Sequence, residues 1–214
     1  MRLTVLGSSA SQPGAGDASS SYLVTGGRRR RDRVLLDCGS GIVGNLLQHT
    51  ALSELSAIFV SHMHPDHYID LIAMRYGLRY GDGRSRPLDV YLPPGGRDQL
   101  QAVSEAISKT QPFFEGALNI HEYEPEAPLT VGDLTVRPFR VVHGIPSHGM
   151  PWTTDGRAWS TRPTPSFVPS SRLPPLVRTC SLPRPPSEVA LPTTTTRGRT
   201  CLRLRPVRSR CARA

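Results

Sequence analysis

The segment from residue 62 to residue 67 holds the densest group of potential metal ligands in the sequence. It contains His62, His64, Asp66 and His67. A packed core has little use for such a group, because buried polar side chains need hydrogen-bond partners and these would need many at once. A zinc-class divalent ion supplies such partners, since it binds imidazole nitrogen and carboxylate oxygen. We therefore expect His62 and His64 to share one ion, and Asp66 and His67 to bind a neighbouring one.

A strongly apolar strand is predicted directly before this group, over residues 55–60, so the ligands are expected at its carboxyl end. The apolar spacing that follows predicts a helix over residues 68–80. A fifth potential ligand, His143, follows another predicted strand. Further strands are expected over 3–6, 21–25, 34–37, 88–92, 118–123 and 134–142, and further helices over 42–48 and 97–109. This order indicates an α/β fold, in which sites gather at strand ends.

Four segments of the chain together resemble the metallo-β-lactamase fold and, within it, the ribonuclease Z-like branch. They are Leu-Gly-Ser-Ser at 6–9, Leu-Asp-Cys-Gly-Ser-Gly at 36–41, the His-x-His-x-Asp-His group with the strand before it, and Val-His-Gly-Ile-Pro-Ser at 142–147. The resemblance covers residues 1 to about 150. It implies an α/β fold of the four-layer αββα sandwich type, of which this chain carries the N-terminal portion only.

The resemblance also assigns metal-binding roles. It implies that His62, His64 and His143 bind a first Zn²⁺ ion and that Asp66 and His67 bind a second, as in intact family members, which hold two ions. The implied reaction is hydrolysis by a metal-activated water, and Asp66 would orient that nucleophile and act in proton transfer. A phosphodiester is the expected substrate.

The remaining histidines, and the adjacent residues Asp37 and Cys38, are interpreted as residues that do not bind the metal. His148 stands where the family often has an aromatic residue, so it is left out of the ligand set, and its replacement by alanine is expected to change metal content little. His49 and His121 are interpreted as surface residues. Asp37 is expected to order the loop near the site as a hydrogen-bond acceptor, and Cys38 to be a small buried apolar residue.

Two later ligands of the family have no match in this chain. The family pattern requires an aspartate that bridges both metals and a final histidine near the C-terminus. Asp155 is the only aspartate after His143, and its surroundings favour a hairpin turn. No histidine follows His148. One bound ion or fewer is therefore expected for this chain.

The segment over residues 153–214 differs in composition from the rest of the sequence. Twelve of its residues are arginine, so the net charge of +9 comes from this segment. It is rich in Pro, Thr and Ser and offers no apolar face, and such a composition cannot bury enough surface to fold. We expect an incomplete metallo-β-lactamase-like domain over 1–152 and a low-complexity, disordered Arg/Pro/Thr-rich tail over 153–214.

Three functions stay open for the chain. The first is a zinc-dependent phosphodiesterase or ribonuclease Z-like hydrolase, which acts on a small-molecule or RNA phosphodiester. The second is hydrolysis of another ester, such as a lactone, thioester or sulfate ester. The third is a truncated product without catalysis. The resemblance also implies a homodimer in intact relatives. The short apolar N-terminus and the cysteine usage indicate a cytoplasmic protein that does not enter a membrane.

The tail has an explanation in the genetic code. When the codons of residues 159–165 are read one base earlier, they are compatible with Leu-Val-Tyr-Ser-Ala-Asp-Thr, which supplies the missing strand and aspartate. The same shift turns the threonine run at 194–196 into codons compatible with histidines. We therefore predict that the coding sequence changes frame near Ala158. Sequencing the gene tests this prediction, and the absence of an open frame with an Asp-Thr strand and a later histidine would contradict it.

Overall fold

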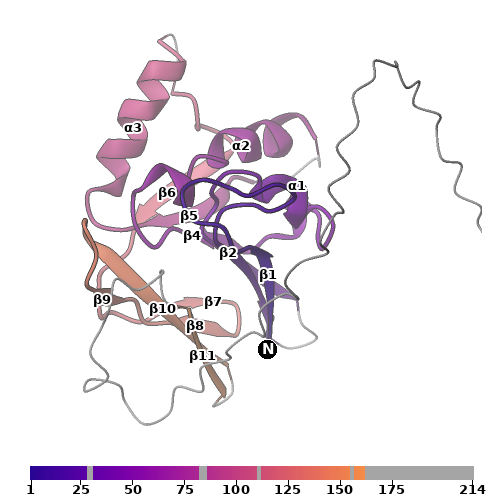
Figure 1. Ribbon diagram of the computed structural model, residues 1–214, viewed down its shortest axis with the longest axis vertical. Helices are drawn as coiled ribbons and strands as arrows, with labels where there is room; N and C mark the ends of the chain where they lie inside the picture. The colour runs from indigo at the N-terminus through magenta and orange to yellow at the C-terminus, as the bar shows by residue number, and fades with distance from the viewer. Residues whose placement is uncertain (28–30, 82–85, 110–111, 155–156, 162–214) are drawn as a thin grey trace, which may run out of the picture. The chain divides into compact units, whose positions relative to one another are not determined.

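The computed structural model describes residues 1–27, 31–81, 86–109, 112–154 and 157–161. They form two β-sheets and three α-helices (Figure 1). The disordered tail was expected over 153–214; residues 155–156 and 162–214 of it lie outside the described residues, whereas 153–154 and 157–161 belong to strands. No described helix has the length and apolar character that a bilayer-spanning segment requires.

The first sheet has six strands in sequential order. Neighbouring strands β1 to β3 run antiparallel, whereas β3 to β6 run parallel. The carboxyl ends of β3 to β6 therefore meet at one edge of the sheet. The strands are β1 (Arg2–Gly7), β2 (Ser21–Gly26), β3 (Asp32–Leu36), β4 (Ala57–Phe59), β5 (Leu88–Leu92) and β6 (Leu118–Glu122).

The helices contribute to a core on one face of the first sheet. They are α1 (Ile42–Leu46), α2 (Leu71–Tyr80) and α3 (Gly96–Ile107), with short 3₁₀ turns η2 (Leu52–Glu54) and η3 (Pro65–His67). On α2, Leu71, Met74 and Leu78 are buried at helical spacing. Alternate residues of β5, among them Val90 and Leu92, join them in the same core.

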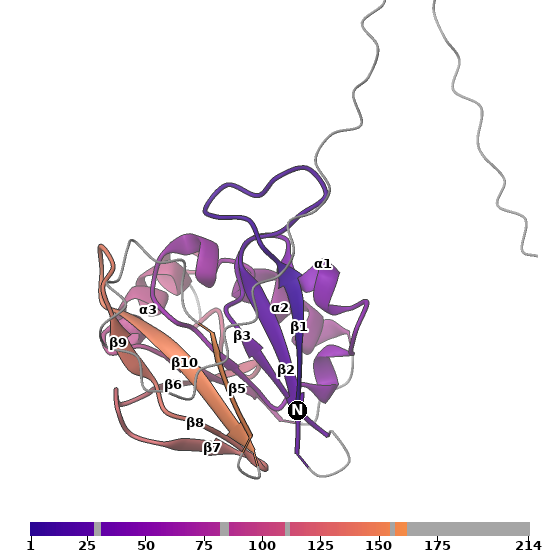
Figure 2. The ribbon, with the colours of Figure 1, turned by 60° about the horizontal axis from the view of Figure 1, so that its bottom comes forward.

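The second sheet packs against the other face of the first. Its strands are β7 (Leu129–Val131), β8 (Leu134–Val136), β9 (Phe139–Val141), β10 (Ser147–Thr154) and β11 (Arg157–Thr161). Between the sheets, the Phe59 ring stacks on Tyr91 at a centroid distance of 4.6 Å and meets the edge of Trp152 at 5.1 Å. Figure 2 shows the orange β10 running along this second sheet beside the strands of the first.

These layers confirm the α/β metallo-β-lactamase-type fold. Helices, first sheet and second sheet form three of the four layers of an αββα sandwich. Among the described residues, all three helices belong to the core on the first sheet. The described part therefore corresponds to the N-terminal portion that the resemblance implies.

The expectation of one strand over residues 134–142 is wrong. The segment forms two strands, β8 and β9, which pair with different parts of β10. Pro138 lies between them and has no amide hydrogen to donate to a ladder, so the chain changes direction there. Sequence patterns also missed β7, whose three residues are too few for an alternation to stand out.

The pairing of β10 with β11 carries strand structure past the expected boundary at Trp152, as far as Thr161. A hairpin turn was expected around Asp155, but the two paired strands were not, because a backbone ladder needs few apolar side chains and suits the β-branched Thr153 and Thr154. The division of the chain at residue 152 stays a proposal.

Replacing Phe59 by alanine tests the packing between the sheets. The ring is 1% exposed and contacts both layers. We expect Phe59→Ala to lower the free energy of unfolding by about 3–5 kcal/mol, through lost apolar burial and the cavity left behind. Urea denaturation measures this loss. The control Leu47→Ala, at a side chain that is 52% exposed, should cost less than about 1 kcal/mol, and equal losses in both variants would contradict the account.

Candidate metal centre

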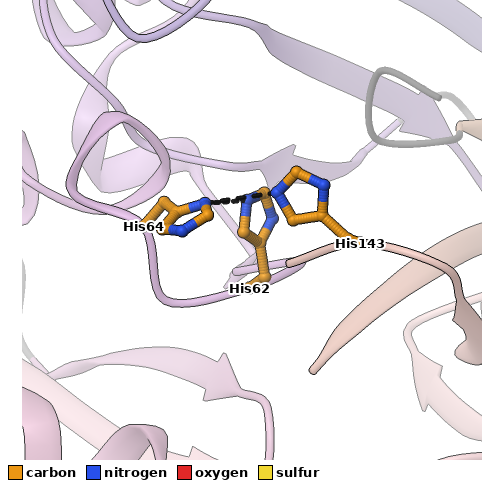
Figure 3. Close-up of side chains that lie close together, drawn as sticks. All are labelled: His62, His64 and His143. Atoms are coloured by element: carbon orange, nitrogen blue, oxygen red, sulfur yellow. Dashed lines mark hydrogen bonds between the residues drawn. The ribbon is translucent and has the colours of Figure 1, made fainter. Parts of the chain in front are cut away.

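Three histidines from two sheets converge at the carboxyl edge of the first sheet (Figure 3). His62 and His64 lie in the loop that follows β4, and His143 lies just after β9 of the second sheet. The burial of β4 between two layers fixes the start of the first loop, and the pairing of β9 with β10 fixes the start of the second. Residues about 80 positions apart in the sequence are thereby brought into contact.

The ligand atoms of these histidines have spacings suitable for one metal ion. His62 Nε2 lies 3.1 Å from His64 Nδ1, which lies 3.2 Å from His143 Nε2. The three atoms all lie within 4.8 Å of one another. Ligand nitrogens about 2.0–2.1 Å from a tetrahedral zinc are separated by roughly 3.3 Å. The residues present therefore fit a zinc-class ion.

Burial keeps the first of these histidines neutral. His62 is 1% exposed, and this burial, followed by the nearby charge of His67, lowers its pKa to about 3. A neutral imidazole has a free lone pair, which is the form that a metal binds. His143 Nδ1 is buried and has no hydrogen-bond partner within the described part of the chain.

Asp37 organises the loop that carries His62. One carboxylate oxygen accepts the backbone N–H of Ser61 at 2.7 Å, and the other accepts the Ser61 hydroxyl at 2.9 Å. Because the hydroxyl proton is engaged there, the Ser61 oxygen serves as acceptor for His62 Nδ1–H, 3.0 Å away. That arrangement leaves His62 Nε2 unprotonated and turned toward His64. The expected role of Asp37 as a loop-ordering acceptor matches these contacts.

The same carboxylate reaches the second pair of predicted ligands. His67 Nδ1 lies 2.8 Å from Asp37 Oδ2, which leaves His67 Nε2 3.4 Å from Asp66 Oδ2. Burial alone would lower the pKa of His67. The hydrogen bond and charge of Asp37, with the charge of Asp66, outweigh burial and raise that pKa.

A cavity of about 470 Å³ opens over these residues. Its opposite wall is the loop between β1 and β2. The Asp17 carboxylate holds that loop by accepting hydrogen bonds from Ser8, Ser9 and Ala18. The cavity therefore offers room for a substrate next to the candidate ligands. It is lined by Ser9, Ala10, Ser11, Ser20, His62, His64, Pro65, Asp66, His67 and His143.

The other residues considered in the sequence lie elsewhere. His49 is exposed after α1, and His121 pairs with Asp89 at 2.9 Å on β5. Cys38 is buried in the helix-side core, as expected. His148 lies outside the histidine trio, but it is 2% exposed and hydrogen-bonded to Tyr123.

Sequence reasoning missed the contributions of Ser61 and Tyr123 to this region. Ser61 precedes His62 in the chain but binds Asp37, 24 residues away, and Tyr123 approaches from the end of β6. Their only sequence signal was their place at the ends of predicted strands.

The raised pKa of His67 gives a test of the Asp37 network. A raised folded-state pKa means that protonated His67 stabilises the metal-free fold below its unfolded pKa, and that this contribution is lost as pH rises through the folded pKa. Asp37→Asn should lower the His67 pKa, because it removes the negative charge that stabilises the protonated ring against the effect of burial. NMR titration of the ring protons in metal-free protein measures the shift. Asp98→Asn on the exposed face of α3 should leave it unchanged, and an unaltered His67 pKa in Asp37→Asn would refute the assignment.

Comparison with known proteins extends these observations. A ribonuclease Z from Halorubrum lacusprofundi is 31% identical over 158 residues, which are 73% of this chain and 49% of that protein. A probable metallo-hydrolase, YhfI of Bacillus subtilis, is 29% identical over 157 residues, 73% of this chain and 60% of that one. The chain thus spans about half of the first relative and three-fifths of the second.

The fold is also found in a solved structure. The crystal structure of the short form of human tRNase Z superposes with a TM-score of 0.63 at 24% identity, over 78% of this chain and 71% of that one. At this sequence identity, the similarity shows a shared fold and carries no conclusion about activity. The β-lactamase superfamily domain matches residues 32–165, which is more than half of the sequence. The chain therefore belongs to the β-lactamase superfamily and has the metallo-β-lactamase fold.

Proposed function

We propose that this protein is a metal-dependent hydrolase that cleaves phosphodiesters. The single observation that carries the proposal is the convergence of His62, His64 and His143 on one point beside Asp66 and His67. The superfamily fold implies binding of a divalent metal, and this cluster is where the described residues would hold it.

The proposed first site uses His62 Nε2, His64 Nδ1 and His143 Nε2. Three protein ligands leave a coordination position open, which is typical of catalytic zinc. The proposed second site uses Asp66 Oδ2 and His67 Nε2. Zinc is the proposed metal, because a site rich in imidazole nitrogen suits it better than it suits magnesium or calcium.

The chemistry follows from the residues that surround the cavity. A divalent ion bound there would polarise a phosphoryl oxygen and acidify a water molecule. Asp66 would orient that water by accepting a hydrogen bond and would take up its proton. Asp37 would keep the His62 and His67 rings turned with Nε2 toward the cavity. The Ser9–Ser11 segment would face the substrate from the opposite wall.

Substrate, assembly and location belong to the proposal as well. The curated relatives named ribonuclease Z support an RNA phosphodiester, and a cavity of about 470 Å³ also suits a small-molecule phosphodiester. A homodimer rests on the resemblance to intact relatives. A cytoplasmic location rests on cysteine usage, of which buried, free Cys38 is the described example.

Metal content tests the two proposed sites. The first keeps three ligands, whereas the described residues supply only two at the second, too few to hold zinc firmly against water and chelators. We expect the purified full chain to hold about one zinc ion or fewer and His62→Ala to abolish binding. His49→Ala, which removes an exposed histidine after α1, is the matched control and should retain the ion. Elemental analysis after dialysis gives the ratio.

Hydrolysis of bis-p-nitrophenyl phosphate completes this test. The chain should turn the ester over slowly, and His62→Ala should remove that activity, whereas His49→Ala should retain it. Two tightly held ions together with activity that depends on His67 would show that residues outside the described part complete the second site. That result would overturn the expectation that the second site binds zinc weakly. No metal at all in the wild-type chain would overturn the proposed function itself.

A further inference from the structure

Two buried polar side chains meet at the boundary between the sheets, next to the loops that carry the histidine trio. They are Tyr123, which follows β6 of the first sheet, and His148, the second residue of β10 in the second sheet. Both are 2% exposed. From their contacts we infer that Tyr123 and His148 form a brace that holds the His143 loop in position against the His62 loop. Both would be positioning residues for the metal centre.

The contacts of the brace converge on the backbone directly before His62. The Tyr123 hydroxyl lies 3.0 Å from His148 Nδ1, 3.1 Å from the Val60 carbonyl oxygen and 3.2 Å from the Ser61 carbonyl oxygen. The backbone N–H of His148 donates to the same Ser61 carbonyl at 3.1 Å. The peptide group that joins Ser61 to His62 is therefore held from the second sheet, while Asp37 holds Ser61 from the first.

The hydroxyl proton fixes the direction of these hydrogen bonds. A tyrosine hydroxyl donates one proton, and both carbonyl oxygens only accept. If Tyr123 donated to His148, its oxygen would face two carbonyl oxygens with no hydrogen between them. If His148 carries its proton on Nδ1, that N–H donates to Tyr123 and the hydroxyl proton serves a carbonyl. The second arrangement satisfies the buried groups, so the structure assigns the Nδ1–H tautomer to His148.

The position of His148 explains why the brace matters for His143. His143 is the second residue of a short connection from β9 to β10, and His148 lies just past the end of that connection. Val142 in this connection is 72% exposed, so core burial does little to hold it. The anchored ends decide where the His143 ring lies. The pairing of β9 with β10 closes the connection, and the brace ties it to the first sheet, which carries His62 and His64.

This inference rests on the proposed function where it concerns metal affinity, but not where it concerns the loop. It also changes the expectation from the sequence that replacing His148 has little effect on metal content. If Tyr123 and His148 contribute to packing alone, replacing them should lower the stability of the fold without a specific effect on the position of His143 relative to His62 and His64. The experiment therefore needs variants that separate stability from position.

Four variants of the full chain make that separation. Tyr123→Phe removes only the hydroxyl. His148→Asn keeps a donor near the place of Nδ1, whereas His148→Phe keeps a ring and loses the donor. Ser104→Ala is the matched control, because it removes a buried hydroxyl that accepts the Phe113 N–H at 2.8 Å on α3, remote from the carboxyl-edge loops in sequence and in contacts.

The first readouts use metal-free protein. ¹⁵N NMR should find His148 protonated on Nδ1 in the wild type. Amide exchange in residues 142–145 should quicken in Tyr123→Phe and His148→Phe but not in Ser104→Ala. Zinc Kd, measured by competition with a chromophoric chelator, should rise about tenfold or more in the same two variants, the size typical for residues that orient metal ligands. His148→Asn should stay within about threefold of wild type, well below that range.

The outcomes distinguish this inference from the proposed function. If Tyr123→Phe and Ser104→Ala lower Tm similarly and both keep wild-type exchange and zinc Kd, the pair only packs, and the brace is refuted while the metal site stands. A His148 protonated only on Nε2 would also refute it. If the wild-type chain binds no zinc, the proposed function fails, and the exchange of residues 142–145 alone decides for or against the brace.

Discussion

The carboxylate of Asp37 is the contact on which the site depends. It lies at the end of β3 with a φ of +60°, a backbone conformation that aspartate tolerates better than most residues. It accepts three hydrogen bonds, two from Ser61 and one from His67. These bonds bring the two ends of the ligand loop to one buried group and select the ring nitrogens that face the cavity. An asparagine in its place could not accept from all three donors with the same charge.

The histidine cluster could be predicted from the sequence because its chemistry is local. His62, His64, Asp66 and His67 lie within six residues, and the apolar run before them indicated a strand end. His143 stood at another predicted strand end, but only a family resemblance assigned it to the same ion, since no spacing rule connects it to residues about 80 positions earlier. His143 Nε2 lies 3.2 Å from His64 Nδ1, so the two side chains are neighbours, as the resemblance implies. That they bind a metal ion stays a proposal.

Contacts between distant segments were beyond sequence reasoning. The strands of the first sheet were predicted close to their observed bounds. Strand β4 is buried throughout and gives a continuous apolar run, whereas β5 shows the alternation of a strand with one more deeply buried face. The strands of the second sheet were not, because β7 to β9 have three residues each and are held by pairing with other strands, β7 with β8, and β8 and β9 with β10. His148 shows the consequence. Its neighbours in the sequence indicate no role for it, but in the folded chain β10 lies beside Ser61 and His148 becomes a buried link between the sheets.

We propose that His62, His64 and His143 bind one metal ion together. Anomalous scattering at the zinc edge, from a crystal of the full chain grown with zinc, tests it most directly. We predict a peak about 2.0–2.1 Å from His62 Nε2, His64 Nδ1 and His143 Nε2. A zinc peak bound by other residues, with these three nitrogens still in contact with one another and unligated, would contradict it.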